Sequence, residues 1–482
     1  MTNTTSAPPA DLAARNRLVI ALLLVSGFVV ILNETIMGVA LPNLMESFEI
    51  AASTAQWVST AFMLTMAVVI PITGFLLQRF HTRTVFTAAM SLFSLGTLFA
   101  ALAPTFELLV AARVVQAGGT AIMMPLLFTT VLTLVEPAHR GRVMGNVSIV
   151  ISVAPAIGPT ISGIILNFLE WRWMFILVLP IAISALVLGL AKIPNVTEPR
   201  ATPLDVVSIP LTAFGFGGLV FGLSNLGPEG FGYIGSWLPL VVGVVSLAGF
   251  VLRQIALQKS DRALLDLRTF RNATFTRAIS VIAISMVALF GTIVLLPIYM
   301  QDVLGLEPID TGLLLLPGGL LMGLLAPFVG RAYDRIGPRP LVITGSIIVS
   351  ATLWGMTLLG EGTSQWWVLA AHVVLSLGLA FMFTPLFTAG LGDLQPHLYS
   401  HGSAIVGTTQ QVAGAIGTAL FITVMSGTIT REMAAGVSEV SATADGVHTA
   451  FLYGAVISLV AIPLAFMLRR PANETAGAPP VH

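Results

Sequence analysis

Glu34 lies within residues 32–42 (LNETIMGVALP), a stretch that is otherwise mostly apolar. It is the only Asp or Glu deep inside any long apolar stretch of the chain, and Arg113 is the only Lys or Arg so placed. An ionised carboxylate in hydrocarbon costs about 2.5 to 3.5 kcal/mol on insertion scales, so it needs a partner or a wet cavity. Low dielectric favours the neutral acid and a nearby cation favours the carboxylate. Glu34 is therefore a candidate group for gaining and losing a proton, with a static ion pair to Arg113 as the alternative.

The sequence places these two charges at the same depth. Glu34 lies eight residues before Pro42, and Arg113 lies six residues after Glu107. At 1.5 Å per helical residue, both fall roughly 9 to 12 Å below one surface of the membrane. We expect Glu34 to load a proton, Arg113 to tune it, and polar or cationic groups of a substrate to compete for the carboxylate.

Other polar residues of the apolar stretches are weaker candidates. Gln410 and Gln411 need a partner or a cavity, and we expect at least one of them to face a substrate path. His372 could titrate, but a packed and hydrogen-bonded histidine is the simpler interpretation. His397 and His401 have i, i+4 spacing without a third ligand, so the sequence predicts no metal site.

Composition indicates a membrane protein with many spans. Of 482 residues, 56% are hydrophobic and 9% charged, against about 25% charged in an average soluble domain. The chain has no cysteine, which excludes disulfides and thiolate chemistry, and its net charge is zero. Neither lysine lies in a phosphate-binding loop, so we expect no nucleotide or other cofactor and an ion gradient as energy source.

Stretches of about 20 apolar residues, long enough to cross the hydrocarbon layer, predict fourteen transmembrane helices. The expected spans are 18–41, 55–77, 84–103, 108–131, 142–166, 173–192, 205–226, 236–256, 278–300, 311–329, 340–360, 366–390, 403–426 and 448–468. The connection 427–447 is then a long outer loop, flexible or ordered as a gate.

The distribution of basic residues predicts the orientation. With the N-terminus in the cytoplasm, 19 of the 22 Lys and Arg fall in cytoplasmic segments. Both termini are then cytoplasmic, and the basic segment 253–277 is a topology signal rather than a nucleic-acid site.

An internal repeat predicts how the helices are grouped. Residues 74–86 (GFLLQRFHTRTVF) and 330–342 (GRAYDRIGPRPLV) each begin with Gly and supply basic residues between two spans. Such duplication is typical of transporters in which two bundles rock about a central site. We expect a cytoplasmic tail at 1–17, a six-helix bundle at 18–192, two inserted helices with linkers at 193–277, a second bundle at 278–468 and a tail at 469–482.

Four motifs carry a resemblance to a known family. The loops supply Gly74, Arg79 and Arg83 in the first copy and Gly330, Asp334, Arg335, Gly337 and Arg339 in the second. The fourth span contains RVVQAGG at 113–119, with Arg113, Gln116 and Gly118, and the fifth contains APAIGPTISG at 154–163, with Gly158, Pro159 and Gly163. Residues 402–420 (GSAIVGTTQQVAGAIGTAL) form the last motif. With these, nearly the whole chain resembles the fourteen-helix drug:proton antiporters of the major facilitator superfamily.

The resemblance implies a major facilitator fold, two six-helix bundles plus two inserted helices, and proton-coupled export of amphipathic small molecules or drugs. It implies a substrate cavity formed by Asn33, Glu34, Gln116, Gln410 and Gln411. It also implies conformational gating by Gly74, Arg79, Arg83, Gly158, Pro159, Gly330, Asp334, Arg335 and Arg339. Asp334 could form ion pairs with Arg335 and Arg339 that latch one conformation, with a solvated positive-inside loop as the alternative. The expected partners are small amphipathic or cationic substrates, protons and lipid, for a monomer in the bacterial inner (plasma) membrane.

The sequence departs from the family pattern at two places, in the first span and in the first loop. The family's first-helix acid falls at position 33, where this chain has Asn33 followed by Glu34, a shift of about 100° around the helix. The first loop has Gln78 and His81 where the family has Asp and Gly. Transport of a dedicated lipid or metabolite, and a non-transporting scaffold or receptor, remain as alternatives.

Overall fold

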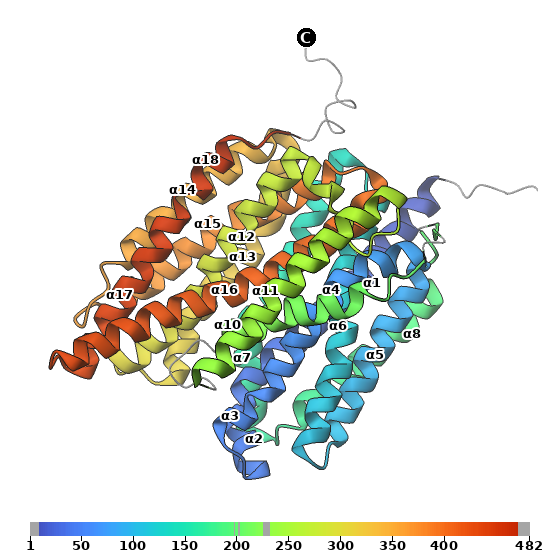
Figure 1. Ribbon diagram of the computed structural model, residues 1–482. Coiled ribbons are helices and arrows are strands. Elements are labelled where there is room, and N and C mark those ends of the chain that lie inside the picture. The colour runs from blue at the N-terminus through green and yellow to red at the C-terminus, as the bar shows by residue number, and fades with distance from the viewer. Residues whose placement is uncertain (1–8, 197, 201–202, 225–231, 471–482) are drawn as a thin grey trace, which may run out of the picture.

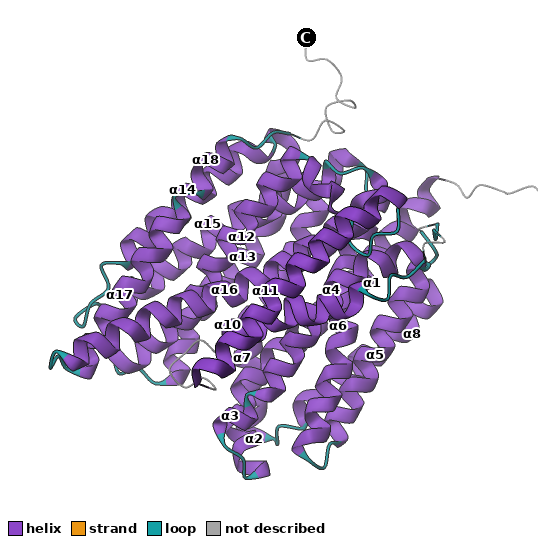
Figure 2. Ribbon diagram, in the orientation of Figure 1, coloured by secondary structure: helices purple, strands orange, loops and turns teal. Residues whose placement is uncertain are grey.

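A computed structural model describes residues 9–196, 198–200, 203–224 and 232–470. In these ranges the chain consists of helices joined by short loops, without strands (Figure 2). The ends of the predicted tails, residues 1–8 and 471–482, lie outside the described residues.

The helices before the middle of the chain follow the predicted spans closely (Figure 1). They are α1 Pro9–Ile36, α2 Leu41–Phe48, α3 Ala52–Ala55, α4 Trp57–Arg79, α5 Thr82–Leu102, α6 Phe106–Leu134, α7 Arg140–Phe168 and α8 Trp173–Lys192. Short 3₁₀ turns lie at Met37–Ala40 and Pro137–His139. We call this part, α1 to α8, the N-terminal half.

The rest of the chain contains the inserted helices and the C-terminal half. The inserted helices are α9 Ser208–Thr212, the π-helical turn Ala213–Gly217, α10 Gly218–Ser224 and α11 Gly232–Leu257. The linker carries 3₁₀ turns at Gln258–Ser260 and Leu267–Arg271. The C-terminal half comprises α12 Ala273–Ile298 with a π turn at Tyr299–Val303, α13 Pro308–Ile336, α14 Pro338–Met356, α15 Gln365–Gly392, a 3₁₀ turn at Pro396–Leu398, α16 Tyr399–Ala434, α17 Glu439–Ser458 and α18 Ala461–Phe466.

Within the described ranges, 13 helices are long and apolar enough to cross a membrane. They correspond to all the predicted spans except 205–226. That region forms a shorter apolar helix, Ser208–Leu223, whose π turn replaces part of the α-helix. The last two residues of the predicted span, 225 and 226, lie outside the described residues.

The prediction of a long outer loop at 427–447 is wrong. Helix α16 continues to Ala434 and α17 begins at Glu439, so four residues connect them. Ala, Ser and Glu are compatible with helix, no proline interrupts the segment, and Gly436, with φ of 86°, makes the turn. At 36 residues, α16 is about 54 Å long and extends beyond the hydrocarbon layer.

The two halves meet along α7 and α13 through small residues. A Cβ built on Gly330 would lie 2.1 Å from the carbonyl oxygen of Gly141, and one built on Gly145 would lie 2.6 Å from that of Ala326. Farther along, Gly323 contacts Val153 and Gly319 contacts Ala156. Without side chains at these glycines, the two helices approach closely over several turns.

Candidate functional site

The buried charge of the N-terminal half, Arg113 on α6, is bound by neutral amides. Its Nη1 donates to Oδ1 of Asn33 on α1 at 3.0 Å, and also to Oε1 of Gln116 one turn along α6. Nε2 of Gln116 donates to the hydroxyl of Thr97 on α5 at 2.7 Å. Arg113 is 1% exposed, while Asn33, Gln116 and Thr97 are 0% exposed. The four side chains form one polar network across α1, α5 and α6.

Close helix packing positions this network. A Cβ on Gly96 of α5 would lie 2.5 Å from the backbone nitrogen of Gln116, so glycine allows α5 and α6 to touch at this level. The guanidinium carbon of Arg113 lies 4.0 Å from the ring centroid of Phe62 on α4. Stacking on a ring stabilises a desolvated cation by about 1 to 2 kcal/mol.

Glu34 lies beside this network without joining it. In the part of the chain that the structure describes, its carboxyl group makes no hydrogen bond and no ion pair within contact distance, although it interacts electrostatically with Arg113. Gly27 lies seven residues earlier and so on the same helix face, and it contacts Val150 of α7 and Leu127 of α6. Glu34 therefore points between α6 and α7, and its side chain is partly exposed.

Two donors of the network have no acceptor. Nδ2 of Asn33 and Nε of Arg113 are buried without a hydrogen-bond partner in the part of the chain that the structure describes. A buried donor without an acceptor costs about 1 to 3 kcal/mol. The arrangement of Asn33, Glu34 and Arg113 is therefore incompletely satisfied in this conformation.

The expected cavity residues have different environments. Asn33 and Gln116 have no exposed surface, because both are packed inside helix interfaces. Gln410 and Gln411 on α16 are partly exposed, and Nε2 of Gln411 contacts Sδ of Met66 on α4 at 3.6 Å. His372 is packed against Gly318 of α13 and is 8% exposed.

Gly158 of the fifth-helix motif positions α1. A Cβ there would lie 2.3 Å from Oγ1 of Thr35, the neighbour of Glu34. The hydroxyl of Thr35 also lies 3.5 Å from the carbonyl of Ala154, at the edge of hydrogen-bond range. Pro159 is exposed, and α7 continues through it to Phe168. Gly158 thus permits the α1–α7 contact beside Glu34.

The two duplicated loops make corresponding contacts across the halves. In the second copy, Gly330 packs on Gly141, and the carboxylate of Asp334 accepts from the backbone N–H groups of Gly141 at 2.8 Å and Arg142 at 2.9 Å. These are amides of the first turn of α7, where the helix dipole favours negative charge. Asp334 therefore ties α13 to the start of α7.

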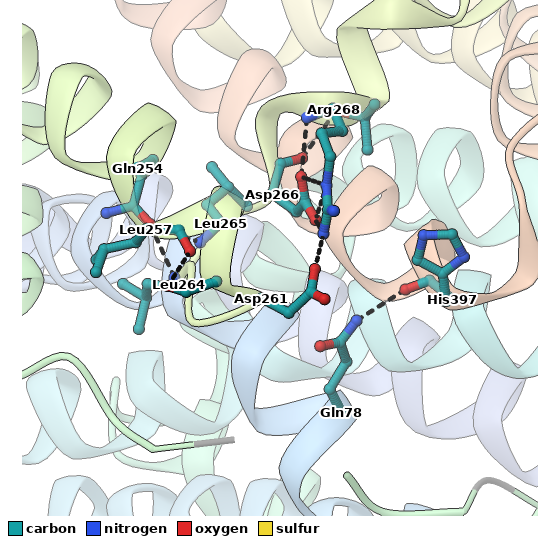
Figure 3. Close-up of polar contacts among 11 residues, drawn as sticks. Gln78, Gln254, Leu257, Asp261, Leu264, Leu265, Asp266, Arg268 and His397 are labelled. Carbon is teal, nitrogen blue, oxygen red and sulfur yellow. Dashed lines mark hydrogen bonds and ion pairs between the residues drawn. The ribbon is translucent and has the colours of Figure 1, made fainter. Parts of the chain in front are cut away.

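In the first copy, Gly74 of α4 packs on His401 in the first turn of α16, 2.8 Å from a built Cβ to Nδ1. Nε2 of Gln78 donates to the carbonyl of His397 at 2.7 Å (Figure 3). The same loop position thus contacts the start of a helix in the other half in both copies, but through a carboxylate in one and an amide in the other.

The expected ion pairs of Asp334 with Arg335 and Arg339 do not form among the described residues. Both arginines are exposed on the surface, whereas the carboxylate faces α7. Arg79 is also exposed, and Arg83 is exposed with a hydrogen bond to the carbonyl of Leu190. The motif residues of greatest structural effect are the glycines and Asp334, because they lie at the interface.

Further hydrogen bonds join the halves at this end of the molecule. Arg140, at the start of α7, donates from Nη1 to the carbonyl of Gly392 at 3.2 Å and from Nη2 to the hydroxyl of Tyr399 at 3.1 Å. The hydroxyls of Thr129 and Ser403 lie 3.2 Å apart, and those of Ser148 and Thr384 lie 2.8 Å apart. All lie in the half of each helix nearest the duplicated loops.

The linker before α12 forms a folded polar cluster next to the first loop (Figure 3). Oε1 of Gln254, 0% exposed, accepts from the backbone N–H groups of Leu264 at 2.8 Å and Leu265 at 3.2 Å. Arg268 pairs with Asp266 and Asp261, both at 2.5 Å. Burial raises the pKa of Asp266, but hydrogen bonds from Arg268 outweigh it and hold this pKa below its ordinary value.

This linker cluster was not identified from the sequence. Its acids and arginines lie in a segment whose charge pattern also fits an exposed topology signal. The one available signal is Leu264–Leu265 directly before Asp266, an apolar pair that indicates burial. No group of three or more His, Cys, Asp or Glu side chains that could hold a metal occurs in the described ranges, and His397 and His401 stay an incomplete pair.

Helices of this length and hydropathy, with a charged network buried between them, define a polytopic membrane protein. The sequence profile of the Major Facilitator Superfamily matches residues 23–418. The chain belongs to this superfamily, whose members are membrane transporters rather than enzymes.

Similar proteins support the assignment. The chain is 41% identical over 462 residues to YcnB of Bacillus subtilis (strain 168), an uncharacterised MFS-type transporter, covering 96% of this chain and 97% of that one. It is 41% identical over 457 residues to the lincomycin resistance protein LmrB of Listeria monocytogenes, covering 94% and 96%. The human organic anion transporter MFSD10 has the same fold, with a TM-score of 0.66 at 15% identity over 95% of this chain and all of that chain.

Proposed function

We propose that the protein is a proton-coupled antiporter that exports amphipathic small molecules, drugs among them, by alternating access. The observation that carries the proposal is Glu34, an acid that has no direct partner among the described residues and points between α6 and α7 beside buried Arg113. A carboxyl group so placed can bind a proton in one environment and release it in another. A static ion pair, the alternative for these two residues, is not favoured by a geometry in which Arg113 binds Asn33 instead.

Relatives support the choice of cargo. LmrB is named for lincomycin resistance, and it matches this chain over nearly its full length. We therefore place antibiotics and similar amphipathic compounds first, and a dedicated lipid or metabolite second.

We also propose fourteen crossings, in the order six, two and six, with both termini in the cytoplasm. Both ends of the described chain lie toward the same end of the molecule (Figure 1), which an odd number of crossings would not allow. Counting the helix Ser208–Leu223 as a crossing satisfies this condition. The proposed units are residues 18–192, 193–277 and 278–468.

The conformation supports an outward-open state in this scheme. The hydrogen bonds that Gln78, Arg140, Asp334 and Ser148 make between the two halves lie near the duplicated loops, at the end that the basic residues assign to the cytoplasm. Asp334 and Gln78 would then be contacts that break when the cytoplasmic side opens. Proton binding to Glu34 from outside would precede that opening.

Uptake into inverted membrane vesicles tests the proposal. Under an imposed pH gradient, acid inside, we expect accumulation of lincomycin and of the lipophilic cation tetraphenylphosphonium, abolished by a protonophore. Accumulation of a lysolipid alone would support the dedicated lipid cargo. Uptake that ignores the pH gradient would contradict proton coupling.

A further inference from the structure

Asn33 and Glu34 are consecutive residues, so their side chains leave α1 about 100° apart. Asn33 is fully buried and accepts from Arg113, whereas Glu34 points between α6 and α7. The guanidinium therefore has two possible partners on adjacent positions of one helix. In this structure the neutral one holds it.

The unsatisfied groups lie on the same two side chains. Nδ2 of Asn33 and Nε of Arg113 are both donors, and both lack an acceptor within the described ranges. A carboxylate is an acceptor with two oxygens, so one ionised Glu34 could satisfy both donors. Arg113 is the one charged group that acts on Glu34 among the described residues, so no second acid or base from α4, α7 or α8 competes in this exchange.

From this geometry we propose that Asn33 is a positioning residue that holds Arg113 away from Glu34 while Glu34 carries a proton. When Glu34 loses the proton, its carboxylate takes the free donors of Arg113 and Asn33. The inference rests on the proposed function, since it concerns how Glu34 loads and releases H⁺.

The amide of Asn33 is suited to this task because it accepts and donates without charge. Its oxygen binds Arg113 in one state, and its nitrogen is available to a carboxylate in the other. Gln116, anchored by Thr97, keeps a second contact to Arg113 in both states, so the cation moves only a short way. An aspartate at position 33 would instead give Arg113 a charged acceptor at the same place.

Two substitutions of Asn33 should shift the proton affinity of Glu34 in opposite directions. Asn33→Asp neutralises Arg113 and adds a negative charge, so Glu34 should stay protonated to a pH about one unit higher. Asn33→Leu removes the competing acceptor, so Arg113 turns to Glu34 and should lower the pH midpoint by about one unit. Asn33→Ser, too short to reach Arg113, should act like Asn33→Leu and replaces it if that variant does not insert.

Infrared difference spectroscopy of purified protein measures this midpoint without a substrate. The Glu34 signal is the carboxylic-acid absorption that disappears in the Glu34→Gln variant of the same background, recorded across a pH series. Circular dichroism and size-exclusion chromatography confirm that each variant is folded. A merely structural role for Asn33 would lower stability without opposite shifts of the midpoint.

The possible results separate this inference from the proposed function. Opposite shifts support the switch, whereas equal midpoints, or shifts of one sign, in folded Asn33 variants would overturn it. If no absorption titrates differently between wild type and Glu34→Gln, or if Glu34→Gln still transports in a pH-driven manner, the role of Glu34 itself fails. That outcome would remove the proposed function and the inference together.

Discussion

Arg113 illustrates how this protein keeps a charge within the membrane. Its guanidinium is stacked on Phe62 and bound by the amides of Asn33 and Gln116, so its charge is dispersed over neutral partners. A buried arginine paired permanently with an acid would be costly to separate. In the mechanism that we propose, these neutral partners allow Arg113 to respond to the protonation of Glu34.

Gly158, which contacts Thr35 next to Glu34, allows a prediction for a single side chain. Gly158→Ala would force a Cβ to within 2.3 Å of Oγ1 of Thr35, and overpacking of this kind costs about 1 to 3 kcal/mol. We expect lower thermal stability in detergent and slower transport, because α1 must move away from α7. Gly163→Ala, on the same helix with nothing within 4 Å, is the matched control and should behave as wild type. Equal behaviour of the two variants would show that the close approach is unimportant.

Among the helices, hydrogen bonds at the beginnings of α7 and α16 hold the two halves together. Asp334 binds the first-turn amides of α7, and Gln78 binds the carbonyl just before α16. The glycines four residues earlier in each loop let the helices cross closely enough for these contacts. The duplicated loops thus make equivalent contacts between the halves, through a carboxylate in one copy and an amide in the other.

Loss of the Asp334 carboxylate should weaken the contact between α13 and the start of α7. Charge at a helix N-terminus contributes about 1 kcal/mol, so Asp334→Asn should raise the population of separated halves about fivefold. A single cysteine at buried Ser148 reports separation, because the natural chain has no cysteine. We expect faster labelling by a thiol reagent in Asp334→Asn and an unchanged rate in Arg335→Gln, whose side chain is exposed. An unchanged labelling rate in Asp334→Asn would show that this carboxylate does not hold the two halves together.

The inserted helices are held by an ion pair with a predictable pH dependence. Arg253 binds Asp205 with two hydrogen bonds of 2.6 Å, and these lower the pKa of Asp205 from 3.8 to about 2. Because the folded value is lower than the unfolded one, the pair stabilises the fold above about pH 4 and loses this effect as the pH falls toward 2. Because Arg253 is 36% exposed, solvent screening weakens the stabilisation that this ion pair provides.

Melting temperatures in detergent at pH 7 and pH 3 test this ion pair. Asp205→Asn should be less stable than wild type at pH 7, and the difference should shrink at pH 3. Asp261→Asn is the control, because Asp261 is 76% exposed. A difference that does not change with pH would mean that the ion pair is not its cause.

At the scale of the whole molecule, hydropathy and basic residues predicted nearly all the helices, since membrane spans depend on composition and length. They did not reveal the π turn in the inserted helix, because a backbone irregularity leaves hydropathy unchanged. Counting residues along the helices predicted that Glu34 and Arg113 lie at the same depth in the membrane. The sequence did not predict the rotation of α1 about its axis, which places Asn33 rather than Glu34 in direct contact with Arg113. Rotation depends on packing, as at Gly27 and Gly158, which a single sequence does not specify.

Cysteine labelling tests the proposed fourteen crossings. Gly227→Cys and Arg262→Cys flank α11 along the chain. In intact cells, an impermeant thiol reagent should label position 227 and leave position 262 unlabelled until the cells are opened. Labelling of Arg17→Cys, before the apolar part of α1, in intact cells would reverse the proposed orientation. Labelling of 262 but not 227 in intact cells would contradict it as well.

We propose that Glu34 carries the proton that drives export. Proton movement in proteoliposomes, followed with a pH-sensitive dye as lincomycin or tetraphenylphosphonium is added, measures this role. We predict substrate-dependent proton flux for wild type and none for Glu34→Gln, although that variant should still exchange labelled for unlabelled substrate. Wild-type proton flux through folded Glu34→Gln would contradict the claim.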